Sequence, residues 1–183
     1  MAQSWRVKRD RNKQPRPPLD AERLERLGLH YVGRYATSRA KLRAYLARKI
    51  RERGWEGSPP DVEALVERFS ALGYLDDSAF ATARAASLQR RGYGERRVDQ
   101  ALRAAGIDES DAAEAREQVE AGAMEAAIRF AKRKRIGPFA AGEPDRDARQ
   151  KAFAAMMRAG HPMDVVRRVL NASAGDIPEC DTL

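Results

Sequence analysis

Residues 72–108 read LGYLDDSAFATARAASLQRRGYGERRVDQALRAAGID, and this stretch predicts a helical fold. Asp76 or Asp77 can cap the helix that follows, because an aspartate at this place accepts a backbone N–H of the first turn. Glycines at 92 and 94 then end one helix and open the next. Apolar residues recur at spacings of three and four, and alternating β-branched runs are absent. The stretch therefore predicts short helices that are separated by glycine turns.

The same signals recur on both sides of this stretch, from residue 19 to residue 172. Ser58 precedes two prolines and is expected to cap a helix whose apolar face includes Leu65, Phe69 and Leu72. Met163 is expected to face inward from the last helix, and residues 137–144 are expected to form a loop. With their capping residues, the nine expected helices cover about residues 20–35, 38–54, 58–73, 76–92, 94–106, 108–119, 121–135, 145–160 and 162–171.

A threefold pattern organises these helices. The segment ALRAAGI at 101–107 resembles AMMRAGH at 155–161, and a looser copy runs through residues 46–61. Tandem helical units of about 50 residues predict an all-α protein in which three three-helix repeats form an elongated, curved array. The expected parts are a disordered basic arm at 1–18, repeats at 19–73, 74–119 and 120–172, and an irregular tail at 173–183.

Charge is distributed unevenly over the 183 residues. The chain carries 35 Lys and Arg against 27 Asp and Glu, a formal net charge of +8. Residues 1–53 hold 16 basic and 5 acidic side chains, a net +11, and the remainder is net −3. This asymmetry favours a polyanionic partner, although a basic tail that serves only solubility would give the same pattern. Cysteine occurs once, no apolar run reaches the ~20 residues of a membrane span, and residues 1–18 lack an apolar signal core. We therefore expect a cytoplasmic protein with no membrane partner.

Residues with catalytic potential are few and scattered. The histidines His30 and His161 lie far apart, and Cys180 has no nearby histidine, so neither a metal site nor a cysteine nucleophile is expected. The adjacent Asp76 and Asp77 could bind Mg²⁺, but a helix cap with a first-turn acid accounts for both. Glycine-rich nucleotide fingerprints are missing. The sequence therefore predicts a binding protein that is not an enzyme and has no cofactor.

Basic clusters are the candidates for partner binding. The helix dipole favours cations at the C-terminal end of a helix, which explains part of two clusters. It does not explain Arg96 and Arg97, which stand at the N-terminal start of an expected helix. Aromatic residues are not interleaved with these runs in the sequence, so a platform for base stacking is not expected. The candidates for contact with a recombinase or with DNA are Arg34, Arg39, Lys41, Arg43, Arg48, Lys49, Arg90, Arg91, Arg96, Arg97, Lys132, Arg133, Lys134 and Arg135.

The glycine-rich centre also resembles a known family. The segments LGYLDDSAFA at 72–81, RRGYGERRV at 90–98, AL at 101–102 and GI at 106–107 are similar to the central signature of the RecX regulators of bacterial recombinase. SRAKL at 38–42, with Arg48 and Lys49, is similar to the N-terminal motif of that family, and the resemblance covers about residues 20–171. Lys41 stands where the family pattern has an acid, and Gly160-His161 replaces a glycine–aromatic pair. Residues 137–144 resemble an insertion.

This resemblance implies a monomeric, non-enzymatic modulator of RecA, usually an inhibitor. Such a protein would lie in the groove of the RecA–DNA filament and suppress strand exchange, ATP hydrolysis and assisted cleavage of the SOS repressor, which would affect DNA repair. The residues by themselves leave one alternative open. Helices such as 95–105, preceded by a short turn, also fit a direct DNA-binding protein that uses helix-turn-helix-like units on single- or double-stranded DNA.

Overall fold

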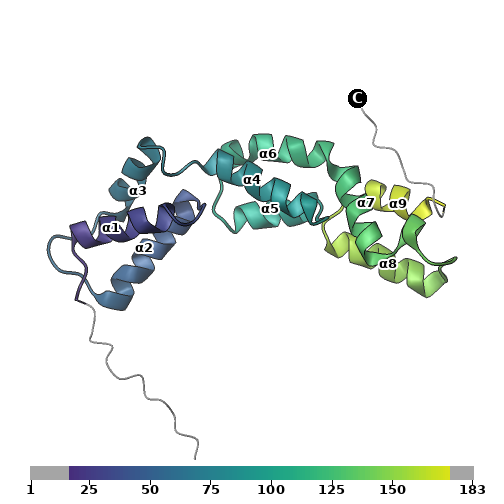
Figure 1. Cartoon of the computed structure of the whole chain (residues 1–183), viewed down its shortest axis with the longest axis horizontal. Helices are drawn as coiled ribbons and strands as arrows, with labels where there is room; N and C mark the ends of the chain where they lie inside the picture. The colour runs from purple at the N-terminus through teal and green to yellow at the C-terminus, as the bar shows by residue number, and fades with distance from the viewer. Residues whose placement is uncertain (1–16, 174–183) are drawn as a thin grey trace, which may run out of the picture.

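The computed structural model describes residues 17–173, and within them the protein is helical with no strand. The helices follow one another along the long axis of the molecule (Figure 1). Most of the arm predicted at 1–18 and of the tail predicted at 173–183 lies outside the described residues. The elements are α1 (Ala21–Val32), α2 (Arg39–Arg53), α3 (Val62–Ala71), α4 (Asp77–Arg90), α5 (Glu95–Arg103), α6 (Glu109–Ala121), α7 (Ala123–Lys134), the 3₁₀ helix η1 (Gly137–Phe139), α8 (Arg146–Arg158) and α9 (Met163–Asn171).

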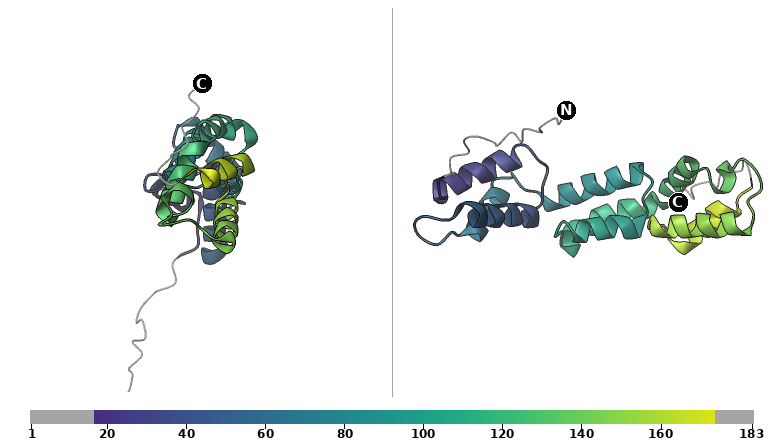
Figure 2. Two further views of the ribbon diagram at one scale, coloured as in Figure 1. Left: turned by 90° about the vertical axis from the view of Figure 1, so that its right-hand side faces the viewer. Right: turned by 90° about the horizontal axis from the view of Figure 1, so that it is seen from below.

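Three separate apolar clusters hold these helices together. One is built by α1–α3 around Phe69, one by α4–α6 around Leu102, and one by α7–α9 around Met156. We call these helix groups the first, second and third trio, and they succeed one another along an elongated molecule in Figure 1 and in the right-hand view of Figure 2. The predicted all-α, elongated helical array is therefore confirmed. The repeat borders at residues 73, 119 and 172 stay a prediction.

Side-chain caps fix most helix starts as the sequence predicts. Asp20, Ser38, Asp76 and Asp145 each accept a backbone N–H from the first turn of their helix. The expected cap at Ser58 is wrong, because Asp61 caps α3 through the N–H of Ala64 at 2.9 Å. A residue before proline avoids the helical region, so two successive prolines delay the start of the helix until they have passed.

Helix ends are where predicted burial is wrong. Phe69 and Leu102 are buried as expected, but the side chain of Leu72 is 60% exposed and Met163 is 46% exposed. Leu72 is the C-terminal cap of α3 and Met163 is the first residue of α9, so neither has a full helical turn around it. Tyr35 is likewise 52% exposed, because α1 ends three residues earlier at Val32. The three- and four-residue spacing of apolar residues predicts which of them lie on the buried face of a helix, but only for positions inside that helix.

Candidate functional site

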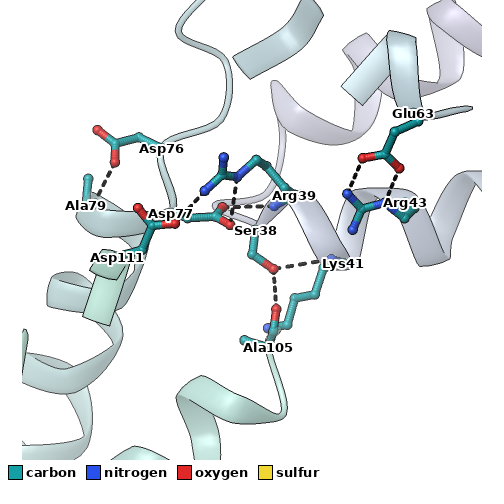
Figure 3. A network of polar contacts seen from close by, with 10 residues as sticks. All are labelled: Ser38, Arg39, Lys41, Arg43, Glu63, Asp76, Asp77, Ala79, Ala105 and Asp111. Atoms are coloured by element: carbon teal, nitrogen blue, oxygen red, sulfur yellow. Dashed lines mark hydrogen bonds and ion pairs between the residues drawn. The ribbon is translucent and has the colours of Figure 1, made fainter. Parts of the chain in front are cut away.

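A polar network joins the first and second trios (Figure 3). The buried hydroxyl of Ser38 donates to the carbonyl oxygen of Ala105 at 2.6 Å. Asp77, only 5% exposed, accepts from the backbone N–H of Arg39 at 2.9 Å and from its Nε at 3.1 Å, and the same guanidinium contacts Asp111. We call these five residues the first joint. The hydrogen bond with Asp77 raises the pKa of Arg39. This predicted contact residue is thus engaged in ion pairs within the protein itself, although its side chain is 39% exposed.

Other predicted cations of the first trio also have partners within it. Arg43 donates through its Nε to Glu63 at 2.6 Å, and this hydrogen bond raises the pKa of Arg43. Lys49 pairs with Glu52 at 2.6 Å, and Arg48 approaches the same carboxylate at 3.6 Å. These residues remain accessible, but their charge is partly neutralised.

Aromatic rings accompany these cations, and the contacts are local because Tyr45, Arg48 and Lys49 lie three and four residues apart on α2. Arg48 and Lys49 lie 5.7 and 5.8 Å from the centre of the Tyr45 ring, which stacks on Tyr31 at 4.1 Å. Arg34 lies 5.9 Å from the centre of the Tyr35 ring. Each of these rings is therefore already covered by a cation or by a second ring, and the prediction that the basic clusters form no platform for base stacking stays a prediction.

Lys41 points away from this cluster and toward the second trio. Its Nζ lies 4.8 Å from the centre of the Phe80 ring on α4. Burial of the ammonium and the nearby charge of Arg84 lower the pKa of Lys41. Lys41 thus faces a second cation across the gap between two trios, at the place where the family pattern has an acid.

An arginine-lined cavity follows on the second trio. It has a volume of about 340 Å³, and Arg84, Arg91 and Arg97 line it together with Tyr93. The Cζ atoms of Arg91 and Arg97 lie 5.3 and 5.9 Å from the centre of the Tyr93 ring. The other lining residues are Leu88, Gln100, Ala101 and Ala104, so none of the described residues that line the cavity is acidic. Sequence reasoning missed Arg84, although it lies one helical turn after Phe80 on the same face of α4.

Main-chain contacts between the second and third trios hold the end of this cavity in place. The N–H of Gly94 donates to the carbonyl oxygen of Ala159 at 3.0 Å, and the N–H of Arg96 donates to that of Gly160 at 3.1 Å. A Cβ atom on Gly94 would lie 2.5 Å from the carbonyl carbon and oxygen of Gly160. We call Gly94, Arg96, Ala159, Gly160 and His161 the second joint. It requires glycine at 94 because the two backbones touch there.

His161 completes the second joint as a packed residue. It is fully buried, and its Nε2 lies 3.2 Å from the carbonyl oxygen of Gly92, so this nitrogen carries the proton. Burial lowers the pKa of His161 to about 4, against a smaller opposing effect of the hydrogen bond to Gly92. The ring packs against Phe130 at 5.5 Å. A neutral histidine therefore ties the arginine-bearing turn to the third trio.

One cation of the third trio contacts Arg91, which lines the cavity. Arg133 donates to the carbonyl oxygen of Arg91, and its Cζ lies 5.4 Å from the centre of the Phe130 ring. The structure thus gathers Lys41, Arg84, Arg91, Arg97 and Arg133, which we call the cation row. The remaining predicted cations Arg90, Arg96, Lys132, Lys134 and Arg135 are exposed beside it. Whether any of them binds a partner stays a prediction.

The described residues offer neither a cluster of metal ligands nor a membrane-spanning helix. Between residues 17 and 173, no group of three or more His, Cys, Asp or Glu side chains could hold a metal ion. The helices in that same range are all too short or too polar to cross a bilayer.

Known proteins share both the sequence pattern and the fold. The family model described as RecX, second three-helix domain, matches residues 76–115. The regulatory protein RecX of Myxococcus xanthus is 32% identical over 159 residues, which cover 82% of this chain and 85% of that protein. The regulatory protein RecX of Agrobacterium fabrum is 32% identical over 134 residues, 71% of this chain and 72% of that protein. The crystal structure of RecX from Lactobacillus salivarius has the same fold, with a TM-score of 0.61 at 14% identity over 82% of this chain and 94% of that one.

Proposed function

The chain belongs to the RecX family of regulatory proteins, and on that basis we propose that it binds the RecA–DNA filament and mainly inhibits it. The affected activities are strand exchange, ATP hydrolysis and co-protease action on the SOS repressor, and through them DNA repair. In this proposal the protein is a cytoplasmic, monomeric, non-enzymatic regulator that works by occupying a surface.

The observation that carries the proposal is the cation row on an elongated molecule. The row runs from Lys41 in the first trio to Arg133 in the third, across both joints. A small ligand would need one enclosed cavity, whereas a row of this kind suits a long partner with repeated negative charge. A filament of protein and DNA is such a partner.

Direct DNA binding through a helix-turn-helix unit is the second candidate, and the second joint disfavours it. The N-terminal residues of a recognition helix contact base edges in the major groove. The backbone at the start of α5 instead donates its N–H groups to the third trio, at Ala159 and Gly160. Deep insertion of α5 would require the third trio to detach, which favours contact along the side of the molecule.

The test is inhibition of the DNA-dependent ATPase of RecA by the full chain. Arg96→Glu with Arg97→Glu reverses two exposed charges in the first turn of α5, where acids are favourable for the helix. We expect inhibition to weaken at least about tenfold, or roughly 1.4 kcal/mol. The control is Arg146→Glu with Arg149→Glu, an equal reversal in two exposed residues near the start of α8. A wild-type protein that leaves the ATPase unchanged would refute the proposed function, and a double reversal with full potency would remove Arg96 and Arg97 from the interface.

A further inference from the structure

We infer that the cation row binds the sugar–phosphate backbone of a nucleic-acid strand lengthwise, across both joints and without reading its bases. The inference rests on the proposed function only for the source of the strand, which would be the DNA of the filament. It assigns the contact to five side chains, one of which, Arg84, no sequence signal singled out.

The row is continuous because each member contacts or faces the next. Lys41 is close enough to Arg84 for that charge to lower its pKa. Arg84, Arg91 and Arg97 line one cavity, and Arg133 donates to the backbone of Arg91. The described chain places no ion-pair partner on any of the five, whereas Arg39 and Arg43 nearby are both paired. These cations are thus available to an external anion.

Aromatic rings hold the row in place and are themselves covered. Lys41 lies over Phe80, Arg91 and Arg97 lie over Tyr93, and Arg133 lies over Phe130. Phe130 is 5% exposed, and Phe80 and Tyr93 pack partly buried against the core clusters. Bases therefore have little free ring surface on which to stack. A cation held over a ring loses less freedom when it binds a phosphate, which favours recognition of the backbone.

The surroundings of the row favour nucleic acid over an acidic protein. Protein interfaces usually bury apolar or aromatic anchors at their centre. The large apolar residues exposed between positions 17 and 173 are Leu29, Tyr35, Leu72, Tyr74 and Met163, and none belongs to the row or lines its cavity. A surface of cations without apolar anchors suits evenly charged phosphates.

The first joint positions one end of the row. Arg39 and Asp77 fix α2 against the start of α4, which sets Lys41 opposite Arg84. Asp77 is therefore a positioning residue for nucleic-acid binding. Replacing it removes one negative charge, so a general electrostatic attraction predicts tighter binding, whereas disruption of the row predicts weaker binding.

The experiment measures binding of the full chain to fluorescent oligonucleotides at several salt concentrations, with one single-stranded and one duplex arm. Each neutralised phosphate contributes about −0.7 to the log–log salt slope for single strands and about −0.9 for duplex DNA. Arg84→Gln with Arg91→Gln should therefore reduce the magnitude of the slope by about 1.4 or about 1.8. The matched control is Arg103→Gln with Arg129→Gln, the same charge change at exposed residues outside the row. Asp77→Asn should weaken binding although it raises the net charge, with helical content checked by circular dichroism.

Two results would overturn the inference. Equal slopes in the row variant and the control would mean that net charge, and not the row, attracts the strand. Loss of ATPase inhibition in the row variant with unchanged nucleic-acid binding would assign the row to an acidic protein surface, and the proposed function would still stand. If the wild type bound oligonucleotides through the row but left the RecA ATPase unaffected, the inference would hold and the proposed function would fail. Because Arg84 and Arg91 are substituted on the surface, this comparison remains decisive even if Asp77→Asn lowers stability.

Discussion

Gly94→Ala at the second joint should destabilise the protein. The sign of the change in unfolding free energy is informative, because close packing at this joint predicts a loss whereas local backbone preference alone predicts a gain. Gly94 has φ −88° and ψ 178°, which alanine adopts freely, so the loss of unfolded-state freedom alone would stabilise by about 0.4–1 kcal/mol. The added Cβ, however, would lie 2.5 Å from the backbone of Gly160, and backbone atoms cannot rotate away. Ordinary contact distances of about 3.5 Å require the two trios to separate by roughly 1 Å.

That separation removes two hydrogen bonds. The bonds from Gly94 to Ala159 and from Arg96 to Gly160 are 3.0 and 3.1 Å long, so both would pass the usual limit of about 3.2 Å. Each contributes about 1 kcal/mol net, and residual crowding costs about 1 kcal/mol more; less the roughly 0.4–1 kcal/mol gained through the unfolded state, the net loss is about 2–2.6 kcal/mol. A loss of this size should lower the melting temperature by about 4–10 °C in a chain of this length.

The assay is urea unfolding followed by far-UV circular dichroism, together with hydrogen exchange at the Arg96 amide. Gly142→Ala is the control, because a Cβ there meets nothing within 4 Å. We expect faster exchange at Arg96 and a lower midpoint in Gly94→Ala, with both unchanged in the control. A Gly94→Ala protein at least as stable as the wild type would show that the two backbones do not meet as described.

Two further predictions test the core and the buried histidine. Phe69→Ala should lower the free energy of unfolding by about 3–5 kcal/mol because Phe69 is fully buried, whereas Leu72→Ala should change it by no more than about 0.5 kcal/mol because Leu72 is 60% exposed. Equal unfolding midpoints of the two variants in urea would contradict this contrast. The pKa of His161 is about 4 in the folded protein against 6.5 normally, so the unfolded chain binds more protons between these values. The contribution of His161 to the free energy of unfolding should be complete above pH 6.5 and should fall by up to about 3 kcal/mol as the pH drops toward 4. In His161→Phe, the thermal unfolding midpoint should no longer show this part of the pH dependence.

Local signals in the sequence predict most of the helices, since caps such as Ser38 and Asp145 act within one turn. They also predict the burial of Phe69, whose neighbours at three- and four-residue spacing share its face. Errors concentrate where a helix begins or ends, as at Leu72, because periodicity carries no information beyond the last turn.

The site is less predictable because its members come from distant parts of the chain. Lys41 and Arg84 meet across the first joint, and Gly94 meets Gly160 across the second. A density of arginines marks the turn at 90–97 in the sequence, but it does not reveal that Arg39 is neutralised by Asp77. Packing within a trio pairs Arg43 with Glu63, and the packing of one trio on the next pairs Arg39 with Asp77, so the folded structure decides which cations remain without an acidic partner.

The two joints also differ in stiffness. Helices α4 and α6 both pack against α7, whereas no pair of helices within the described chain connects the first and second trios as extensively. The first joint combines the ion pairs of Arg39, of which the one with Asp111 is the more open to screening by salt, with the buried hydrogen bond from Ser38 to Ala105, whereas the second depends on uncharged main-chain atoms. The second and third trios are therefore expected to behave mechanically as one stiffer lever, with the first trio more loosely attached to its end.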